Sequence, residues 1–426
     1  EMTEIRLPHL DEDALARLRA ALAGEIDDPA ALDVHTPRDR LEDYLNVPDE
    51  AVADVGPRWA MTAYVPPTRE GAALLPYVVN DLGIVRNPRG TRIDDREARS
   101  TIGVPDERFR RYVSTGGEQR VLVRPTLFDD SVEHVWFGSH VPVGATKGTL
   151  EAFENTLERP AVSPPLDVAI VLNEGDHDSG PEATPAEAYH VREEVQYTVE
   201  TVVEADRDQL ASVLAGGHDV VHFVGETVPD GFVTDDGVLS VTDVETVDLG
   251  VFFLDAPHSF EEGLWLARNG ALGGVASVGR VDSAVARAVG RTVVRLLNMG
   301  FPLRAALDIA RRDVDASDQF VIVGNGSADI AQPDSSMPVL VRVEAEGDDF
   351  VVEWDTYPGG TFGTGSRIWP TPPQARPFLA PGTGGQSVTL SSATTRELFE
   401  QSESPTRIDG ELHWSKEEVL EALSLS

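Results

Sequence analysis

Short apolar runs alternate with amphipathic segments through the middle of the chain. Runs rich in β-branched residues predict strands at 167–172, 195–203, 219–224, 249–255, 273–278 and 319–323. Between them, apolar residues at helical spacing predict helices at 185–194, 206–215, 259–269, 283–297 and 302–312. Strands that alternate with helices are typical of a parallel sheet covered by helices. We therefore predict an α/β fold with a mostly parallel sheet and helices on both faces.

The pattern is different on either side of this region. Before it, strand and helix signals are mixed, with helices predicted at 11–24 and 149–158 and strands at 119–124 and 133–137. Prolines at 160, 164 and 165 then interrupt regular structure. After Pro338 the pattern favours strands, with a hairpin at 346–349 and one terminal helix at 415–423. We predict an α+β N-terminal domain at 1–160, the α/β domain at 161–335 and a β-rich C-terminal domain at 336–426.

The charge of the chain restricts its partners. Asp and Glu number 73 against 35 Lys and Arg, which gives a formal net charge of -38. Only Lys147 and Lys416 are lysines, so 33 of the 35 basic residues are arginines. An acidic surface repels nucleic acid and anionic membranes, and it stays hydrated where salt screens charge. This composition predicts a halophilic, cytoplasmic protein that binds neither nucleic acid nor membrane. The sequence also has no apolar run of membrane-spanning length and no basic-then-apolar signal pattern.

Two segments at predicted strand ends hold the candidate chemistry. His-Phe-Val-Gly-Glu at 222–226 closes one strand, and Leu-Asp-Ala-Pro-His-Ser at 254–259 closes the next. Functional residues of an open parallel sheet gather beyond the carboxyl ends of its strands. We therefore expect one cleft, and the candidate residues to line it are His222, Glu226, Asp255, His258 and Ser259.

The two segments resemble the CHAT family, which comprises caspase-like peptidases grouped with caspases and separases. The family pattern is His-aromatic-x-Gly-His at one strand end and Leu-Asn-Ala-Cys-x-Ser at the next. Further matches follow in the family's order at 270–275, 297–307 and 323–326, so the resemblance covers roughly residues 167–330. The chain resembles haloarchaeal members in particular, and the resemblance implies a caspase-like fold.

The resemblance also implies that the catalytic dyad is degenerate. Glu226 stands where the family has its catalytic His, and Pro257 stands where it has the nucleophilic Cys. The chain has no cysteine at all, and a proline side chain offers no nucleophile, so Cys-His proteolysis is excluded. We predict a catalytically inactive caspase-like protein that acts in peptide or protein binding, scaffolding or regulation. No cofactor is expected.

Two alternatives remain open. The first is a hydrolase whose site has moved to Glu226, His258 and Ser259, although Ser259 also suits the cap of the following helix. The second is a structural subunit that self-assembles into a homo-oligomer. His222 lies within an apolar strand and is predicted to be a hydrogen-bonded core histidine. No metal site is predicted, because His218 and His222 would lie roughly 13 Å apart on a strand.

Overall fold

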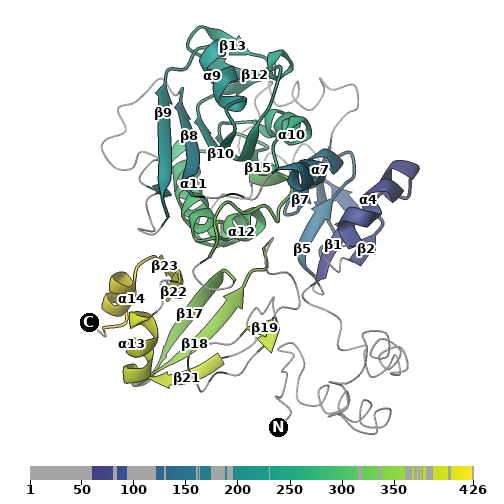
Figure 1. Ribbon diagram of the computed structural model, residues 1–426. Helices are drawn as coiled ribbons and strands as arrows, with labels where there is room; N and C mark the ends of the chain where they lie inside the picture. Colours follow the sequence, from purple (N-terminus) through teal and green to yellow (C-terminus); the bar gives the residue numbers. More distant parts are fainter. Residues whose placement is uncertain are drawn as a thin grey trace.

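The computed structural model describes residues 60–79, 84–93, 121–128, 131–159, 164–173, 195–229, 231–314, 319–333, 337–359, 387–401 and 404–424, with a few shorter pieces between them (Figure 1). The predicted helix at 11–24 lies outside the described residues. The predicted helix at 185–194 also lies outside them, except for Ala188 and Tyr189.

A large mixed sheet forms the centre of the fold. Its described strands lie in the order β2 (Ile84–Arg86), β1 (Ala60–Tyr64), β5 (Ser131–Trp136), β7 (Thr146–Lys147), β16 (Phe320–Gly324), β15 (Gly273–Ser277), β14 (Leu249–Asp255), β10 (His218–Val224), β8 (Leu166–Leu172) and β9 (Tyr197–Val203). Every neighbouring pair is parallel except β15 and β16. The predicted α/β fold with a mostly parallel sheet is therefore confirmed.

Helices cover both faces of this sheet. α9 (Arg207–Leu214) and α10 (Phe260–Asn269) share one apolar cluster with Val221 and Phe252. α11 (Ser283–Asn298) and α12 (Leu303–Asp313) share another with Val220 and Phe253. Successive residues of a strand point to opposite faces, and both faces are buried, so these strands form continuous apolar runs in the sequence. Each fully buried Phe or Val contributes roughly 1.5–3 kcal/mol of hydrophobic stabilisation.

The part of the chain before residue 160 contributes strands to the same sheet. Trp136 of β5 pairs with Lys147 of β7, and Lys147 pairs with Val323 of β16. α7 (Leu150–Glu158) follows, where a helix was predicted at 149–158. It has Thr149 as its N-cap and places Ala152 in the cluster of α9 and α10. Strands from both sides of residue 160 thus belong to one sheet, and the division into three domains stays a prediction. α4 (Arg69–Val79) and a small sheet complete this part: β3 (Gly90–Arg92), β4 (Leu122–Pro125) and β6 (Val141–Pro142).

The C-terminal part has a separate sheet with its own core. Its order is β21 (Ser387–Ser391), β18 (Asp349–Thr356), β17 (Val339–Glu346), β22 (Thr406–Ile408) and β23 (Glu411–His413). Trp354 and Phe399 pack in this core with residues of α13 (Ser392–Glu400) and α14 (Lys416–Ala422). A further short pair joins β19 (Arg367–Ile368) to β20 (Phe378–Leu379). The predicted hairpin is confirmed, since β17 and β18 meet at Gly347, whose φ is 68°. Figure 1 shows this sheet on the α12 side of the large sheet.

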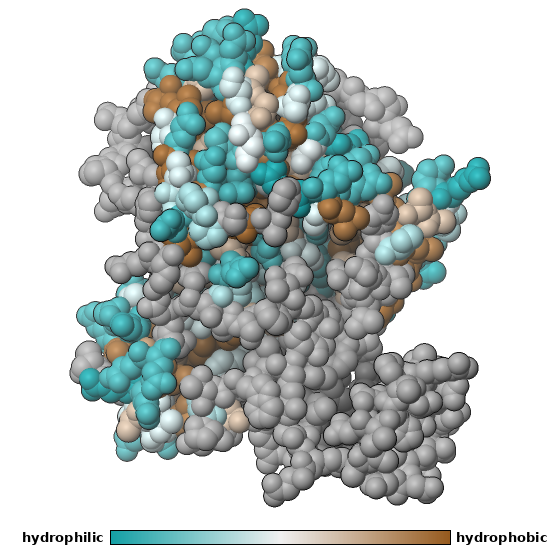
Figure 2. Space-filling model, in the orientation of Figure 1, coloured by the Kyte–Doolittle hydropathy of each residue, from teal (hydrophilic) through white to brown (hydrophobic). Residues whose placement is uncertain are grey.

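Part of the described surface is strongly hydrophilic. Figure 2 shows hydrophilic residues over most of the coloured surface around α9 and β13 (Gly237–Leu239). Within the described residues, no helix is both long enough and apolar enough to cross a membrane.

Candidate functional site

The two candidate segments leave the sheet side by side. β10 and β14 are parallel neighbours, with Val224 opposite Asp255, and the amide of Gly225 donates to the carbonyl of Asp255 at 3.1 Å. Beyond the strands, the hydroxyl of Thr227 donates to the carbonyl of Pro257 at 2.6 Å. The structure therefore brings the segment of Glu226 against the segment of Pro257 at the carboxyl edge of the sheet.

Glu226 leads into a small hairpin beside this edge. Its side chain is exposed, and no ion pair to it occurs in the described part of the chain. Its carbonyl accepts a hydrogen bond from the amide of Val233. Glu226 thus directly precedes a small three-stranded antiparallel sheet formed by β11 (Thr227–Val228), β12 (Gly231–Thr234) and β13. Gly231 has a φ of 142°, and a Cβ there would lie 1.9 Å from the carbonyl oxygen of Leu239. This position therefore requires glycine.

His258 adopts an uncommon backbone conformation. Its φ is 60°, in the left-handed region that histidine visits more readily than most residues. Its amide donates to the carbonyl of Gly279 at 3.0 Å, which holds the turn against the segment after β15. Pro257 and His258 are both half-buried. The edge thus presents the Glu226 carboxylate and a fixed turn that carries a proline and an imidazole.

Ser259 has a structural role inside the fold. It is fully buried, and its hydroxyl oxygen accepts from the amide of Ser277 at 3.0 Å and lies 3.5 Å from the carbonyl of Leu254. The hydroxyl makes no capping bond to α10, so the predicted side-chain cap is wrong. The reason is that the oxygen points across to β15 instead. A nucleophilic serine needs an exposed position, which Ser259 lacks.

Ser277 of β15 also holds the turn that follows β14. Its hydroxyl donates toward the carbonyls of Ala256 at 2.6 Å and Gly279 at 3.1 Å. Together with Ser259, it ties the ends of β14 and β15 into one buried network. Buried polar networks of this kind are rigid when their members are satisfied.

His222 lies away from the other candidates. It is buried on the α11 side of the sheet, where its ring meets Phe253 edge-on at 5.0 Å and its Nδ1 lies 3.5 Å from the Tyr189 hydroxyl. Burial lowers the pKa of His222 to about 4, so its imidazole is neutral at pH 7. The sheet separates it from solvent, and it does not join Glu226, Asp255 and His258 at the edge.

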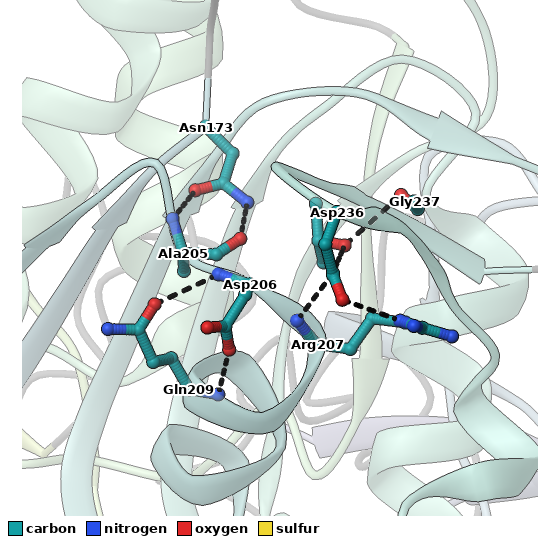
Figure 3. A network of polar contacts seen from close by, with 8 residues as sticks. Asn173, Ala205, Asp206, Arg207, Gln209, Asp236 and Gly237 are labelled. Carbon is teal, nitrogen blue, oxygen red and sulfur yellow. Dashed lines mark hydrogen bonds and ion pairs between the residues drawn. The ribbon is translucent and has the colours of Figure 1, made fainter.

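Asn173 is a polar residue of this edge that the motifs did not reveal. It directly follows β8, and its side chain bonds both the amide and the carbonyl of Ala205 at 2.8 and 3.1 Å (Figure 3). Its amide nitrogen also donates to the carbonyl of Val233 at 3.2 Å. These bonds fix the hairpin of β12 and β13 to the ends of β8 and β9. The signal in the sequence is an amide residue placed immediately after a buried apolar strand.

A second set of contacts anchors the other side of the hairpin. The backbone amide and the Nε of Arg207 donate to the two carboxylate oxygens of Asp236 at 3.0 and 3.1 Å (Figure 3). The hydrogen bond from the Arg207 amide is the main cause of a lowered pKa at Asp236. Asp206 and Gln209 form a capping box at the start of α9. One wall of the candidate site is therefore held in place at both ends.

The described residues contain no group of three or more His, Asp and Glu that could hold a metal ion.

No protein-family model matches the chain, and no curated protein matches its sequence. Among the solved structures that resemble it, two have 14% identity and a TM-score of 0.41. One is the complex of Porphyromonas gingivalis RgpB pro- and mature domains, with 70% of this chain and 86% of that one covered. The other is the Arg-specific cysteine proteinase gingipain R (RGPB), with 70% and 85% covered. A TM-score of 0.41 is too low to indicate the activity of this chain. The resemblance to the CHAT family rests on sequence motifs alone.

Proposed function

We propose that the protein is a catalytically inactive caspase-like protein that binds a peptide at the edge formed by β10 and β14. One observation carries the proposal. The hydrogen bond from Thr227 to Pro257 joins the two segments that resemble the family's dyad motifs, while neither Glu226 nor Pro257 supplies a nucleophile. The buried hydroxyl of Ser259 gives no support to a relocated serine site. The acidic, lysine-poor composition supports a role in a salt-rich cytoplasm.

The charge at this edge favours a basic peptide. Glu226 is an exposed carboxylate and Asp255 a half-buried one, on adjacent strand ends. The turns that carry them are fixed by buried hydrogen bonds, so little conformational entropy is lost when a peptide binds. A guanidinium or ammonium group on an extended peptide would meet these carboxylates with complementary charge.

The binding part of the proposal is tested with fluorescent hexapeptides that carry Arg, Gln or Glu at one central position. Fluorescence polarisation at moderate and high salt should show the Arg peptide bound most tightly. Glu226→Gln should weaken it roughly 1.4- to 5-fold, because an exposed ion pair contributes about 0.2–1 kcal/mol. Glu200→Gln on β9 is the matched control, since Glu200 is also an exposed carboxylate on a strand of the same sheet. Equal binding of all three peptides, or none, would refute the proposed site.

The proposed lack of catalytic activity is tested separately. The same peptides are incubated with the purified protein for days and analysed by mass spectrometry. We expect no cleavage above a protein-free control. Cleavage that His258→Ala abolishes would instead establish a hydrolase with a different set of catalytic groups.

A further inference from the structure

A second candidate site lies between the two sheets. A cavity of about 690 Å³ is bounded by β5, β7, β16 and α12 on one side and by β17, β18 and β22 on the other. None of its lining residues belongs to the strand ends that carry Glu226 and Pro257. Its volume falls in the range of about 300–1,000 Å³ that is usual for small-molecule sites.

The lining of this cavity departs from the charge of the protein as a whole. Five arginines line it against three carboxylates, and Glu353 and Asp313 pair with two of these arginines from outside the lining, whereas acidic residues outnumber basic ones about twofold along the chain. The arginines are Arg304, Arg311, Arg312, Arg342 and Arg407, and the carboxylates are Glu133, Asp308 and Asp355. Guanidinium groups offer planar pairs of donors that match phosphate and carboxylate oxygens.

Ion pairs hold several of these guanidinium groups in fixed positions. Arg304 Nε lies 3.1 Å from Glu133, with side-chain exposures of only 16% and 6%. On the opposite wall, Arg342 Nε lies 2.8 Å from Asp355. A guanidinium that is already ordered loses less entropy when it meets a ligand than one on a free side chain.

Two further donors of the lining have no acceptor among the residues that the structure describes. The hydroxyl of Tyr357 and Nη2 of Arg407 are buried, and neither has a hydrogen-bond partner in the described part of the chain. The Tyr357 ring packs against Phe301 with centroids 5.4 Å apart, so its hydroxyl has a set direction. Nη1 of Arg407 is engaged with Asp313 and with the Gly410 carbonyl, which leaves Nη2 for another acceptor.

The protonation state of both donors suits an anionic ligand. Burial is the main cause of a raised pKa at Tyr357, and the nearby Asp355 adds to it, so the phenol keeps its proton at neutral pH. Arginine is protonated throughout. Native proteins leave few buried donors unpaired, and each such group calls for a partner.

We propose that this cavity binds a small polyanion, a molecule with at least two phosphate or carboxylate groups. Its anionic groups accept hydrogen bonds from Tyr357 and from Arg407, and the molecule also lies against Arg311 and Arg312 of α12. Because α12 and the C-terminal sheet both contribute donors, the ligand bridges the large sheet and the C-terminal sheet.

Isothermal titration calorimetry on the full chain with pyrophosphate, ATP and citrate tests this proposal. Tyr357→Phe removes only the unpaired hydroxyl and should weaken binding roughly 10- to 150-fold, as expected for a hydrogen bond to a charged group. Arg407→Lys keeps a cation beside Asp313 but lacks the second amino group, and it should weaken binding similarly. Arg396→Gln is the control, because Arg396 is 52% exposed on α13 and lies outside the cavity.

Each possible result of the calorimetry either supports or overturns the proposed polyanion site. Binding of pyrophosphate or ATP in preference to citrate, lost in Tyr357→Phe, supports a phosphate ligand, and the reverse preference supports a polycarboxylate. Failure of all three compounds to bind at millimolar concentration overturns the proposal. Binding that Tyr357→Phe leaves unchanged also overturns it, because the ligand would then lie elsewhere. If Arg407→Lys does not fold, Tyr357→Phe alone decides.

Discussion

Substituting Ser259 by alanine tests whether this serine is a structural group or a reactive one. The hydroxyl oxygen is the acceptor for the buried amide of Ser277. Alanine leaves that amide without a partner, and an unsatisfied buried donor costs about 1–3 kcal/mol. We therefore expect Ser259→Ala to loosen the junction of β14 and β15.

Hydrogen exchange followed by mass spectrometry measures this directly. A loss of about 1–3 kcal/mol corresponds to roughly 5- to 150-fold faster exchange of the Ser277 amide when local opening limits exchange. Ser283→Ala is the control, since Ser283 is exposed at the start of α11 and its loss should change stability by less than about 0.5 kcal/mol. Exchange within about twofold of wild type would show that Ser259 does not support β15, and our account of this turn would be wrong.

Three other changes have defined outcomes. The unfolded chain protonates His222 near pH 6.5 and the folded chain only near pH 4, so stability should fall by about 3 kcal/mol as the pH drops through this window. Urea titrations at pH 7 and pH 4 should show that His222→Phe removes this part of the pH dependence. Asn173→Ala should cost about 3 kcal/mol, since it loses three hydrogen bonds, and exchange should quicken first in β12; unchanged exchange there would contradict the anchoring role. Glu133→Ala should cost about 3–5 kcal/mol in thermal or urea unfolding because it leaves the buried Arg304 charge unpaired, and a loss below about 1 kcal/mol would count against this pair.

The strands of the large sheet between residues 166 and 324 were predictable because most of them are buried on both faces. The run at 249–255 coincides with β14, and the run at 167–172 falls within β8. The helices predicted at 149–158 and 415–423 begin within one residue of α7 and α14, whose N-caps are Thr149 and Ser415. Local patterns of this kind need no knowledge of distant parts of the chain.

Features that depend on distant residues were not predictable. β7 has only two residues, too few for any periodicity, yet it connects β5 to β16. The direction of β16 depends on where α11 and α12 return the chain, which hydrophobic spacing does not encode. Ser259 has the residue type of a helix cap, but its hydroxyl bonds to a strand 18 positions later. The arginine-lined cavity likewise joins residues that are far apart in the sequence, from β5 to β22.

Because β15 and β16 are antiparallel, the large sheet has carboxyl strand ends at both of its margins. Strands β9, β8, β10, β14 and β15 end at one margin, whereas β16, β7, β5, β1 and β2 end at the opposite one, because each set is parallel within itself. Loops that follow parallel strands are where α/β proteins change their chemistry with least cost to the core. Substitutions in the loops beside Glu226 and Pro257 therefore leave the strand ends at the opposite edge in place.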